Sequence, residues 1–115
     1  MLNITTSADR PNLRLRLTAR GHAGEATNGE NLTCAAGSIL AYTFAQIVKD
    51  RHAEGLTNKP TLELHEGNAR IDVKCKDEKT FNSLYLAMKV VDVGYALLEN
   101  SFPEKVKLTI NDSLA

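Results

Sequence analysis

The stretch Arg70-Ile71-Asp72-Val73-Lys74-Cys75-Lys76 alternates strictly between charged and apolar side chains. Successive side chains of a β-strand point to opposite faces of its sheet, so this pattern predicts a strand with one face in the core and one in water. The leucines of Leu13-Arg14-Leu15-Arg16-Leu17 alternate with arginines in the same way. These stretches predict two strands of a half-buried sheet, with Cys75 packed on the buried side.

Three weaker patterns predict further strands at about residues 2–6, 61–65 and 105–110. In the last of these, Val106, Leu108 and Ile110 share one face, as expected for a strand that covers a core. The turn-forming residues Glu66-Gly67-Asn68 separate two predicted strands and indicate a tight hairpin.

Two segments show the apolar spacing of amphipathic helices. The first covers about residues 35–49, with Asn31 or Thr33 as its expected N-cap. The second covers about residues 78–99 and carries two apolar stripes, one of Phe81, Leu84, Tyr85, Met88, Val91, Tyr95 and Leu98, the other of Leu86, Val90, Val93 and Leu97. Two stripes exceed what a single sheet can cover, and one way to cover the second is to pack it against the first helix or a second subunit. We favour a homodimer.

The element order ββαββαβ predicts an α/β fold of the α+β type, in which two helices pack against a mixed sheet of about five strands. The 115 residues, 43% of them apolar and 24% charged, suit one soluble domain over residues 1–115. The first six residues, Met1 to Thr6, have neither the basic nor the apolar region typical of a signal peptide, and no window approaches the roughly 18 apolar residues that a membrane span needs. We therefore expect a cytoplasmic protein with free thiols and no membrane contact.

Fourteen basic and fourteen acidic side chains leave no net charge, so direct nucleic-acid binding is not expected. Arg10, Arg14, Arg16 and Arg20 nevertheless follow one another without an intervening acid. They form either the solvated face of a strand or a docking surface for an acidic or ribonucleoprotein partner.

A histidine and a cysteine flank one glycine-rich loop, in which Gly21-His22-Ala23 precedes Cys34 and the glycines are Gly21, Gly24 and Gly29. A thiolate nucleophile is stabilised at a helix N-terminus and beside a histidine, which also serves as a base. With Asn31 as N-cap, Cys34 would be the third helical residue, close to free amides that suit an oxyanion. The same spacing also fits a chain without catalysis, in which the cysteine is a small buried residue and the histidine is a polar residue unrelated to it.

The motifs Gly21-His22-Ala23 and Cys34-Ala35-Ala36, with Ser38 four residues after the cysteine, resemble those of the ribosomal-processing cysteine proteases of Firmicutes. The resemblance covers the whole chain. It implies a cytoplasmic, homodimeric endopeptidase that removes the N-terminal extension of a large-subunit ribosomal protein, the twenty-seventh, during ribosome assembly. It implies His22 and Cys34 as the catalytic dyad, Ser38 as a residue that shapes the substrate pocket, and no metal or cofactor.

The chain departs from the family pattern at Asn31, because the family usually has an aspartate three residues before the cysteine. An amide can cap a helix and orient an imidazole, but it supplies no negative charge to an imidazolium. Glu25 or Glu30 is an alternative source of that charge, or a solvated loop residue. Asn31, Ser38, Gly21 and Gly29 complete the predicted site.

Other functions also fit the sequence. A noncatalytic ribosome-associated or assembly module would keep the fold and dock through its arginines, and a thiol-dependent hydrolase or transferase would act on another acyl substrate. A zinc site of His22, Cys34, His65 and Cys75 has suitable ligands but lacks paired short spacings. His52, at a helix end, and His65, on the polar side of a strand, are expected to have no role in the site.

Overall fold

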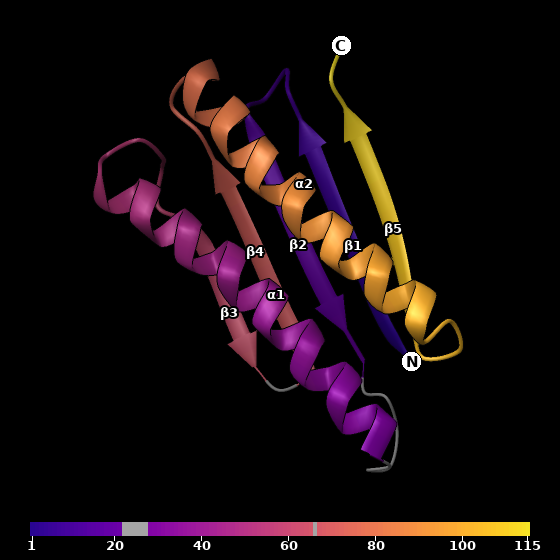
Figure 1. Cartoon of the computed structure of the whole chain (residues 1–115). Coiled ribbons are helices and arrows are strands. Elements are labelled where there is room, and N and C mark those ends of the chain that lie inside the picture. The colour runs from indigo at the N-terminus through magenta and orange to yellow at the C-terminus, as the bar shows by residue number, and fades with distance from the viewer. Residues whose placement is uncertain (22–27, 66) are drawn as a thin grey trace.

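Five strands form one mixed sheet in the order β3-β4-β2-β1-β5, as Figure 1 shows. The strands are β1 (Leu2–Asp9), β2 (Arg14–Arg20), β3 (Thr61–His65), β4 (Asn68–Lys74) and β5 (Val106–Ser113). Only the pairing of β1 with β5 is parallel among these strands. The structure, a computed structural model, describes residues 1–21, 28–65 and 67–115, and only the backbone of residues 28–31.

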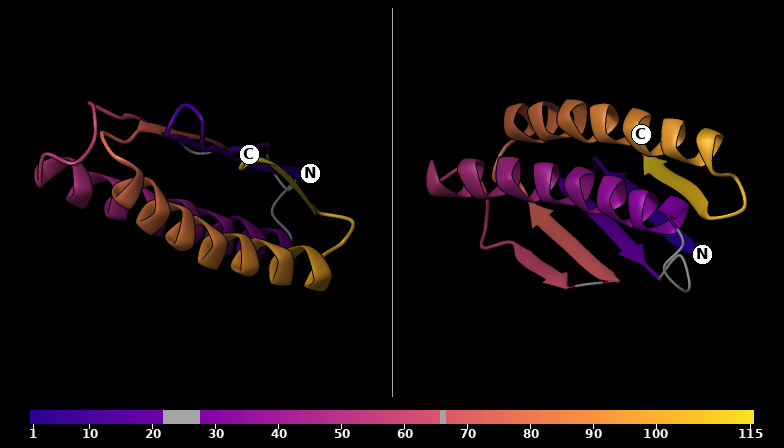
Figure 2. Two further views of the ribbon diagram at one scale, coloured as in Figure 1. Left: turned by 90° about the horizontal axis from the view of Figure 1, so that it is seen from above. Right: turned by 60° about the horizontal axis from the view of Figure 1, so that its bottom comes forward.

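Two helices, α1 (Asn28–Ala53) and α2 (Glu78–Ser101), lie side by side on one face of this sheet. Figure 2 shows that both helices cover the same face and that the opposite face has no helix over it. The order ββαββαβ and the mixed five-stranded sheet confirm the predicted fold class. The core lies between the sheet and the two helices.

The alternating stretches form adjacent central strands, and their apolar side chains are buried. Leu15, Leu17, Ile71 and Val73 are at most 1% exposed. Leu13 differs from the prediction, because it lies in the turn before β2 with a φ of 53° and is only partly buried. Side-chain alternation in the sequence does not reveal such a turn.

β5 is an edge strand, and its apolar residues are buried only at its start. Val106 is 1% exposed, Leu108 is partly buried and Ile110 is 46% exposed. The three residues lie on one face of the strand, as predicted, but only the start of that face is covered. An edge strand lies at the margin of the helical layer, where fewer side chains cover it.

The start of α1 differs from the sequence prediction. The helix begins at Asn28, so neither Asn31 nor Thr33 is the N-cap. The apolar periodicity begins only several residues later, and the first turn consists of polar residues and a glycine that carry no such signal. The start of α2 agrees within a residue: Asp77 is its N-cap, and the Asp77 carboxylate accepts a hydrogen bond of 2.7 Å from the Thr80 N–H.

Close contacts fix α1 against α2 and the sheet. A Cβ atom at Gly94 of α2 would lie 2.6 Å from Leu40 of α1, and one at Gly37 of α1 would lie 2.8 Å from Leu2 of β1. The buried Tyr95 hydroxyl of α2 donates a hydrogen bond of 2.9 Å to the Gly37 carbonyl oxygen. These contacts hold the middle of α1 at a fixed height above the sheet.

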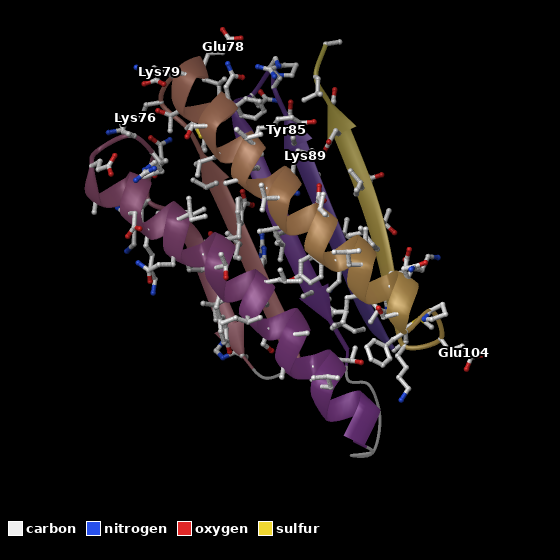
Figure 3. All side chains as sticks on the ribbon, viewed as in Figure 1. Lys76, Glu78, Lys79, Tyr85, Lys89 and Glu104 are labelled. Atoms are coloured by element: carbon white, nitrogen blue, oxygen red, sulfur yellow. The ribbon has the colours of Figure 1, made fainter. Side chains whose placement is uncertain are left out.

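A polar network joins α2 to the strands beneath it. The buried Thr6 hydroxyl of β1 donates to Asp92 at 2.7 Å, and the Lys89 ammonium group donates to Asp92 at 3.0 Å. Lys89 also pairs with Asp112 of β5, and Figure 3 shows Lys89 and Tyr85 on the side of α2 that faces this strand. The network fixes the position of α2 along the sheet.

The expectation that no segment is apolar enough to cross a membrane needs a correction. Leu32–Ala53 of α1 passes that test by length and composition, with a mean hydropathy of 1.2 over its most apolar window. The same composition is found in helices of soluble cores, and here the helix packs against α2 and the sheet.

Candidate active site

Cys34 lines a pocket of about 80 Å³ at the end of the sheet where β2 stops. Three parts of the chain meet there: α1, the ends of β1 and β2, and the β3–β4 hairpin. The lining residues are Leu2, Ala19, Gly21, Cys34, Gly37, Ser38, Ala41, Tyr42, His65, Gly67, Asn68 and Ala69.

The polar wall of the pocket comes from one face of α1. Cys34, Ser38 and Tyr42 follow one another at intervals of four residues, which places them on the same side of a helix. Cys34 is partly exposed, Ser38 is exposed and Tyr42 is 45% exposed. The thiol is therefore within reach of a molecule that enters the pocket from solvent.

Gly21 closes the end of β2 in a conformation that suits only glycine. Its φ is +107°, and a Cβ atom there would lie 2.2 Å from the Met1 carbonyl oxygen. The Gly21 N–H donates a hydrogen bond of 3.0 Å to the Gly67 carbonyl oxygen of the β3–β4 hairpin. Gly21 thus ties the start of the glycine-rich loop to the pocket, and His22 follows it directly in the sequence.

The position of Cys34 within α1 changes one part of the predicted chemistry. Because α1 begins at Asn28, Cys34 is six residues beyond the first helical residue rather than in the first turn. Only the first four N–H groups of a helix lack a partner inside it. The free amides at the start of α1 are therefore not adjacent to the thiol, and the prediction of Cys34 as the third helical residue is wrong.

Several predicted site residues cannot be placed by their side chains. His22 and Glu25 lie outside the described residues. Gly29, Glu30 and Asn31 belong to the first turns of α1, of which the structure describes the backbone. The catalytic role of His22 and Cys34 therefore stays a prediction, while Cys34, Ser38 and Gly21 do line one pocket.

His65, which was expected to have no role in the site, also lines this pocket. His65 ends β3 and pairs with Asn68 across the hairpin, and the hairpin is joined to the end of β2 through Gly67 and Gly21. This long-range contact brings His65 to the pocket of Cys34. The sequence provided only a weak indication of this position. The strand pattern predicted that His65 is the last strand residue before the turn and that its side chain lies on the polar face.

Cys75 and His52 lie away from this pocket. Cys75 follows β4 and is 2% exposed, and its N–H donates a hydrogen bond of 2.8 Å to the Leu13 carbonyl oxygen before β2. Burial, with a smaller contribution from the charge of Asp77, raises the pKa of the Cys75 thiol to about 11. The prediction that Cys75 is a packing residue is confirmed, and a zinc site that joins it to Cys34 does not fit this fold.

His52 lies in the last turn of α1, as expected. Its Nδ1 atom is 3.2 Å from the Thr57 carbonyl oxygen, in the loop that follows the helix. Among residues 1–21, 28–65 and 67–115, no group of three histidine, cysteine, aspartate or glutamate side chains has the arrangement of a metal site. The chemistry that the pocket offers is that of a thiol and neighbouring polar groups.

These features define a small α/β protein with an accessible helical cysteine at the end of its sheet. The family described as "Cysteine protease Prp" matches residues 1–107, and this chain belongs to that family. The resemblance inferred from the His22 and Cys34 motifs is thereby confirmed at the level of the family. Among curated protein sequences, none matches this chain.

Solved structures share the fold over nearly the whole chain. The crystal structure of SMU.848 from Streptococcus mutans is 22% identical, covers 98% of this chain and 96% of its own, and superposes with a TM-score of 0.73. The essential ribosomal processing protease Prp from S. aureus, crystallised with a substrate peptide, is 13% identical with a TM-score of 0.67. The same protease with a covalently linked product peptide is 14% identical with a TM-score of 0.66. Both S. aureus structures cover 96% of this chain and 100% of their own.

Proposed function

We propose that this protein is a cytoplasmic cysteine endopeptidase that removes the N-terminal extension of a large-subunit ribosomal protein, the twenty-seventh, during ribosome assembly. Membership of the Prp cysteine protease family supports the class of reaction. The observation that carries the proposal to particular residues is the pocket in which Cys34, Ser38 and Gly21 meet. The ribosomal substrate follows from the resemblance and from the processing protease of S. aureus, which has the same fold.

In the proposed mechanism, the Cys34 thiolate attacks the carbonyl carbon of the scissile peptide bond. The His22 imidazolium donates a proton to the leaving amine, and a thioester joins Cys34 to the acyl part of the substrate. Water, deprotonated by His22, then hydrolyses the thioester and releases the thiol. The product peptide that is covalently linked to the S. aureus protease is consistent with a nucleophilic mechanism in that protein.

The oxyanion that forms during attack needs hydrogen-bond donors. In α1 the Cys34 N–H lies within the helical hydrogen-bond pattern, so we assign this role to polar groups of the pocket. The Ser38 hydroxyl is the first candidate, because Ser38 is one helical turn after Cys34 on the same wall. Asn31 or one of the neighbouring glutamates would orient His22.

The test is incubation of the purified protein with synthetic N-terminal peptides of the host's ribosomal proteins, followed by mass spectrometry. Cleavage of the extended peptide by the wild type and not by Cys34→Ala supports the proposal. The Cys75→Ala variant is the matched control, because it also removes one thiol but lies away from the pocket. Thermal unfolding of each variant shows that loss of cleavage is not loss of the fold.

His22 is the predicted base, and His65 lines the pocket, so the two histidines are compared directly. With His22 as the base, His22→Ala abolishes cleavage and His65→Ala lowers kcat less than tenfold. The reverse result would assign the base to His65, which lines the pocket. No cleavage of any extended peptide by the folded wild type would instead favour the noncatalytic docking module.

We also propose that the protein is a homodimer whose subunits meet through the outer face of the helical layer. Leu86, Val90, Val93 and Leu97 of α2 form a stripe that is 60–68% exposed. The first helix lies beside this stripe without covering it, so of the two coverings expected from the sequence a second subunit remains. A groove of about 350 Å³ between α1 and α2, lined by Ile39 and Leu97 among others, runs next to the stripe.

In a two-fold dimer the same patch of both subunits forms the interface. The stripe of one subunit could then pack into the groove between α1 and α2 of the other, and the reverse. Light scattering after size exclusion tests this arrangement, with a dimer expected for the wild type and a monomer for Val90→Lys. The control is Lys49→Glu, which changes charge on α1 away from the stripe. A wild type that is monomeric at high concentration would contradict the proposal.

A further inference from the structure

The sheet face that no helix covers is entirely polar. Its side chains come from alternate positions of the five strands, and they point away from the core residues of the same strands. Figure 2 shows this face open along the whole sheet. All six aromatic residues of the chain lie outside the strands, so none belongs to this surface.

Positive charge is concentrated on this open face. Its six basic residues are Arg14, Arg16, Arg20, Arg70, Lys74 and Lys107, and its three acidic residues are Asp9, Glu63 and Asp72. The face therefore has an excess of three positive charges in a chain whose net charge is zero. The net charge of zero is therefore the sum of a basic surface on the open face and an acidic excess on the rest of the chain.

One carboxylate organises the centre of this surface. Arg14 donates two hydrogen bonds to Asp72, at 2.7 and 2.6 Å, and Arg16 donates one at 2.9 Å. A third guanidinium, that of Arg70, lies 3.9 Å from the same carboxylate. The Asp72 side chain is only 9% exposed, whereas those of Arg14, Arg16 and Arg70 are 41%, 46% and 43% exposed.

The carboxylate stays ionised beneath its partners. Burial acts to raise the pKa of Asp72, but the hydrogen bonds from Arg14 and Arg16 outweigh it and hold the pKa below its ordinary value. One negative charge then faces three positive ones. The Asp72 carboxylate holds the guanidinium groups in place and neutralises one of their three positive charges. These side chains stay 41–46% exposed, so an external anion can reach them.

We propose that this open face binds the phosphate backbone of structured RNA. A polyanion gains affinity from every phosphate that releases its counterions, and this gain needs neither apolar contact nor base stacking. The same face continues into a polar depression of about 530 Å³, which is lined by three basic residues, Arg14, Lys59 and Lys74, and by two acidic ones, Asp9 and Asp72. Lys59 adds a further positive charge at this end of the sheet. The absence of aromatic side chains from the strands favours contact with the backbone rather than with the bases.

An acidic peptide suits this surface less well. Exposed ion pairs contribute little on their own, about 0–1 kcal/mol each, and peptide interfaces take most of their affinity from buried apolar anchors. The open face offers no apolar side chain from the strands for such an anchor. The proposal departs from the expectation drawn from net charge, because a polyanion responds to the local distribution of charge rather than to the total.

The test measures fluorescence anisotropy of a labelled RNA duplex of 20 base pairs as wild-type protein is added at several salt concentrations. We expect the logarithm of the binding constant to fall linearly with the logarithm of salt concentration, with a slope of about −3. Arg20→Ala combined with Arg70→Ala should weaken binding at least tenfold at low salt and reduce the slope by about 1.5.

The matched control combines Lys49→Ala with Lys79→Ala, which removes two positive charges from the helices. Lys79 lies at the start of α2, on the helical side of the molecule (Figure 3). We expect this variant to bind RNA as the wild type does. Should the double arginine variant unfold, Arg20→Ala alone serves, because Arg20 is exposed and enters none of the ion pairs seen among the described residues.

Two results would overturn the proposal. The first is equal loss of affinity in the arginine and lysine variants, which would mean that only total charge matters. The second is displacement of the RNA by polyglutamate of equal charge at equal concentration, which would assign the face to an acidic protein. Binding is measured without any cleavage step, so its failure is separate from failure of the proposed proteolysis.

Discussion

The two cysteines of this chain lie at opposite ends of β2 and have opposite surroundings. Cys34 is partly exposed and lines the pocket beside Gly21, just after the strand. Cys75 is 2% exposed and is hydrogen-bonded through its N–H to Leu13, just before the strand. At one end of β2 the cysteine is accessible to solvent, and at the other end the cysteine fills the core.

The difference shows that the surroundings of a thiol, rather than its sequence motif, determine what it can do. Cys75 is surrounded by core residues that exclude water and disfavour its anion. Cys34 lies on a wall that also presents Ser38 and Tyr42. The two ends of the sheet should therefore differ in thiol reactivity, in backbone strain and in their response to pH.

The largest expected effect is that of removing each thiol on peptide cleavage. Cys34→Ala should lower kcat by at least about 10⁴-fold, since loss of a nucleophile removes the covalent step. Cys75→Ala should change kcat less than threefold, because Cys75 lies outside the pocket. Initial rates on the extended ribosomal peptide provide the measurement, and equal losses in the two variants would contradict the assignment.

Alkylation should separate the two thiols by a smaller but still large factor. At pH 8 a thiol with a pKa of about 11 is about one part in a thousand thiolate, and Cys75 is also shielded from solvent. We expect iodoacetamide to modify Cys34 at least about 100-fold faster in the folded protein. Mass spectrometry of tryptic peptides follows both sites. In urea the two rates should become similar, and similar rates in the folded protein would remove the contrast.

Two glycines compare the backbone at the two ends. Gly21→Ala combines a positive φ with a Cβ atom 2.2 Å from the Met1 carbonyl oxygen. Gly55, after α1, has a φ of +78° and open space where its Cβ atom would be. We expect Gly21→Ala to lower the free energy of unfolding by about 3 kcal/mol and Gly55→Ala by about 1 kcal/mol. Urea denaturation measures the free energy of unfolding of both variants. Equal losses would show that the backbone near Met1 moves away from the new Cβ atom at residue 21.

The smallest effect concerns pH. The folded pKa of Cys75, about 11, lies above the ordinary value, so the folded state binds this proton more tightly than the unfolded state. The resulting stability is complete below the unfolded pKa and is lost as the pH rises toward the folded one. Between pH 8.5 and 11 the wild type should lose about 2 kcal/mol more than Cys75→Ala loses.

The matching variant for this pH series is Cys34→Ala, which keeps the buried thiol. It should lose stability with rising pH as the wild type does, because lysines and tyrosines titrate equally in both. Denaturation midpoints at several pH values give the result. A wild type that parallels Cys75→Ala would mean that the buried thiol does not contribute.

Local patterns predicted the fold well because the buried faces repeat with a strict period. Ile71 and Val73 alternate with charges, and the stripe through Phe81 and Leu84 recurs at helical spacing, so strands and helices followed directly. The start of α1 did not follow, because Asn28 and the residues after it carry no apolar signal. The left-handed backbone conformation of Leu13 also has no signal in the sequence.

The site was predicted in part for the same reason. Cys34 and Ser38 are one helical turn apart, so their common wall follows from the helix alone. His65 reaches the pocket through the contact of Gly21 with Gly67, which joins residues far apart in the chain. No local pattern contains such a contact, and the charge that gathers on the open face likewise appears only once the strands are paired.

Tyr42, on the pocket wall with Cys34, gives this site an intrinsic optical probe. The chain has no tryptophan and three tyrosines, so tyrosine is its source of ultraviolet fluorescence. Tyr95 is fully buried between the helices and the sheet, whereas Tyr42 is 45% exposed at the pocket. A peptide seated against Cys34 would change the emission of Tyr42 while leaving that of Tyr95 nearly constant, so substrate binding can be followed without attaching a dye.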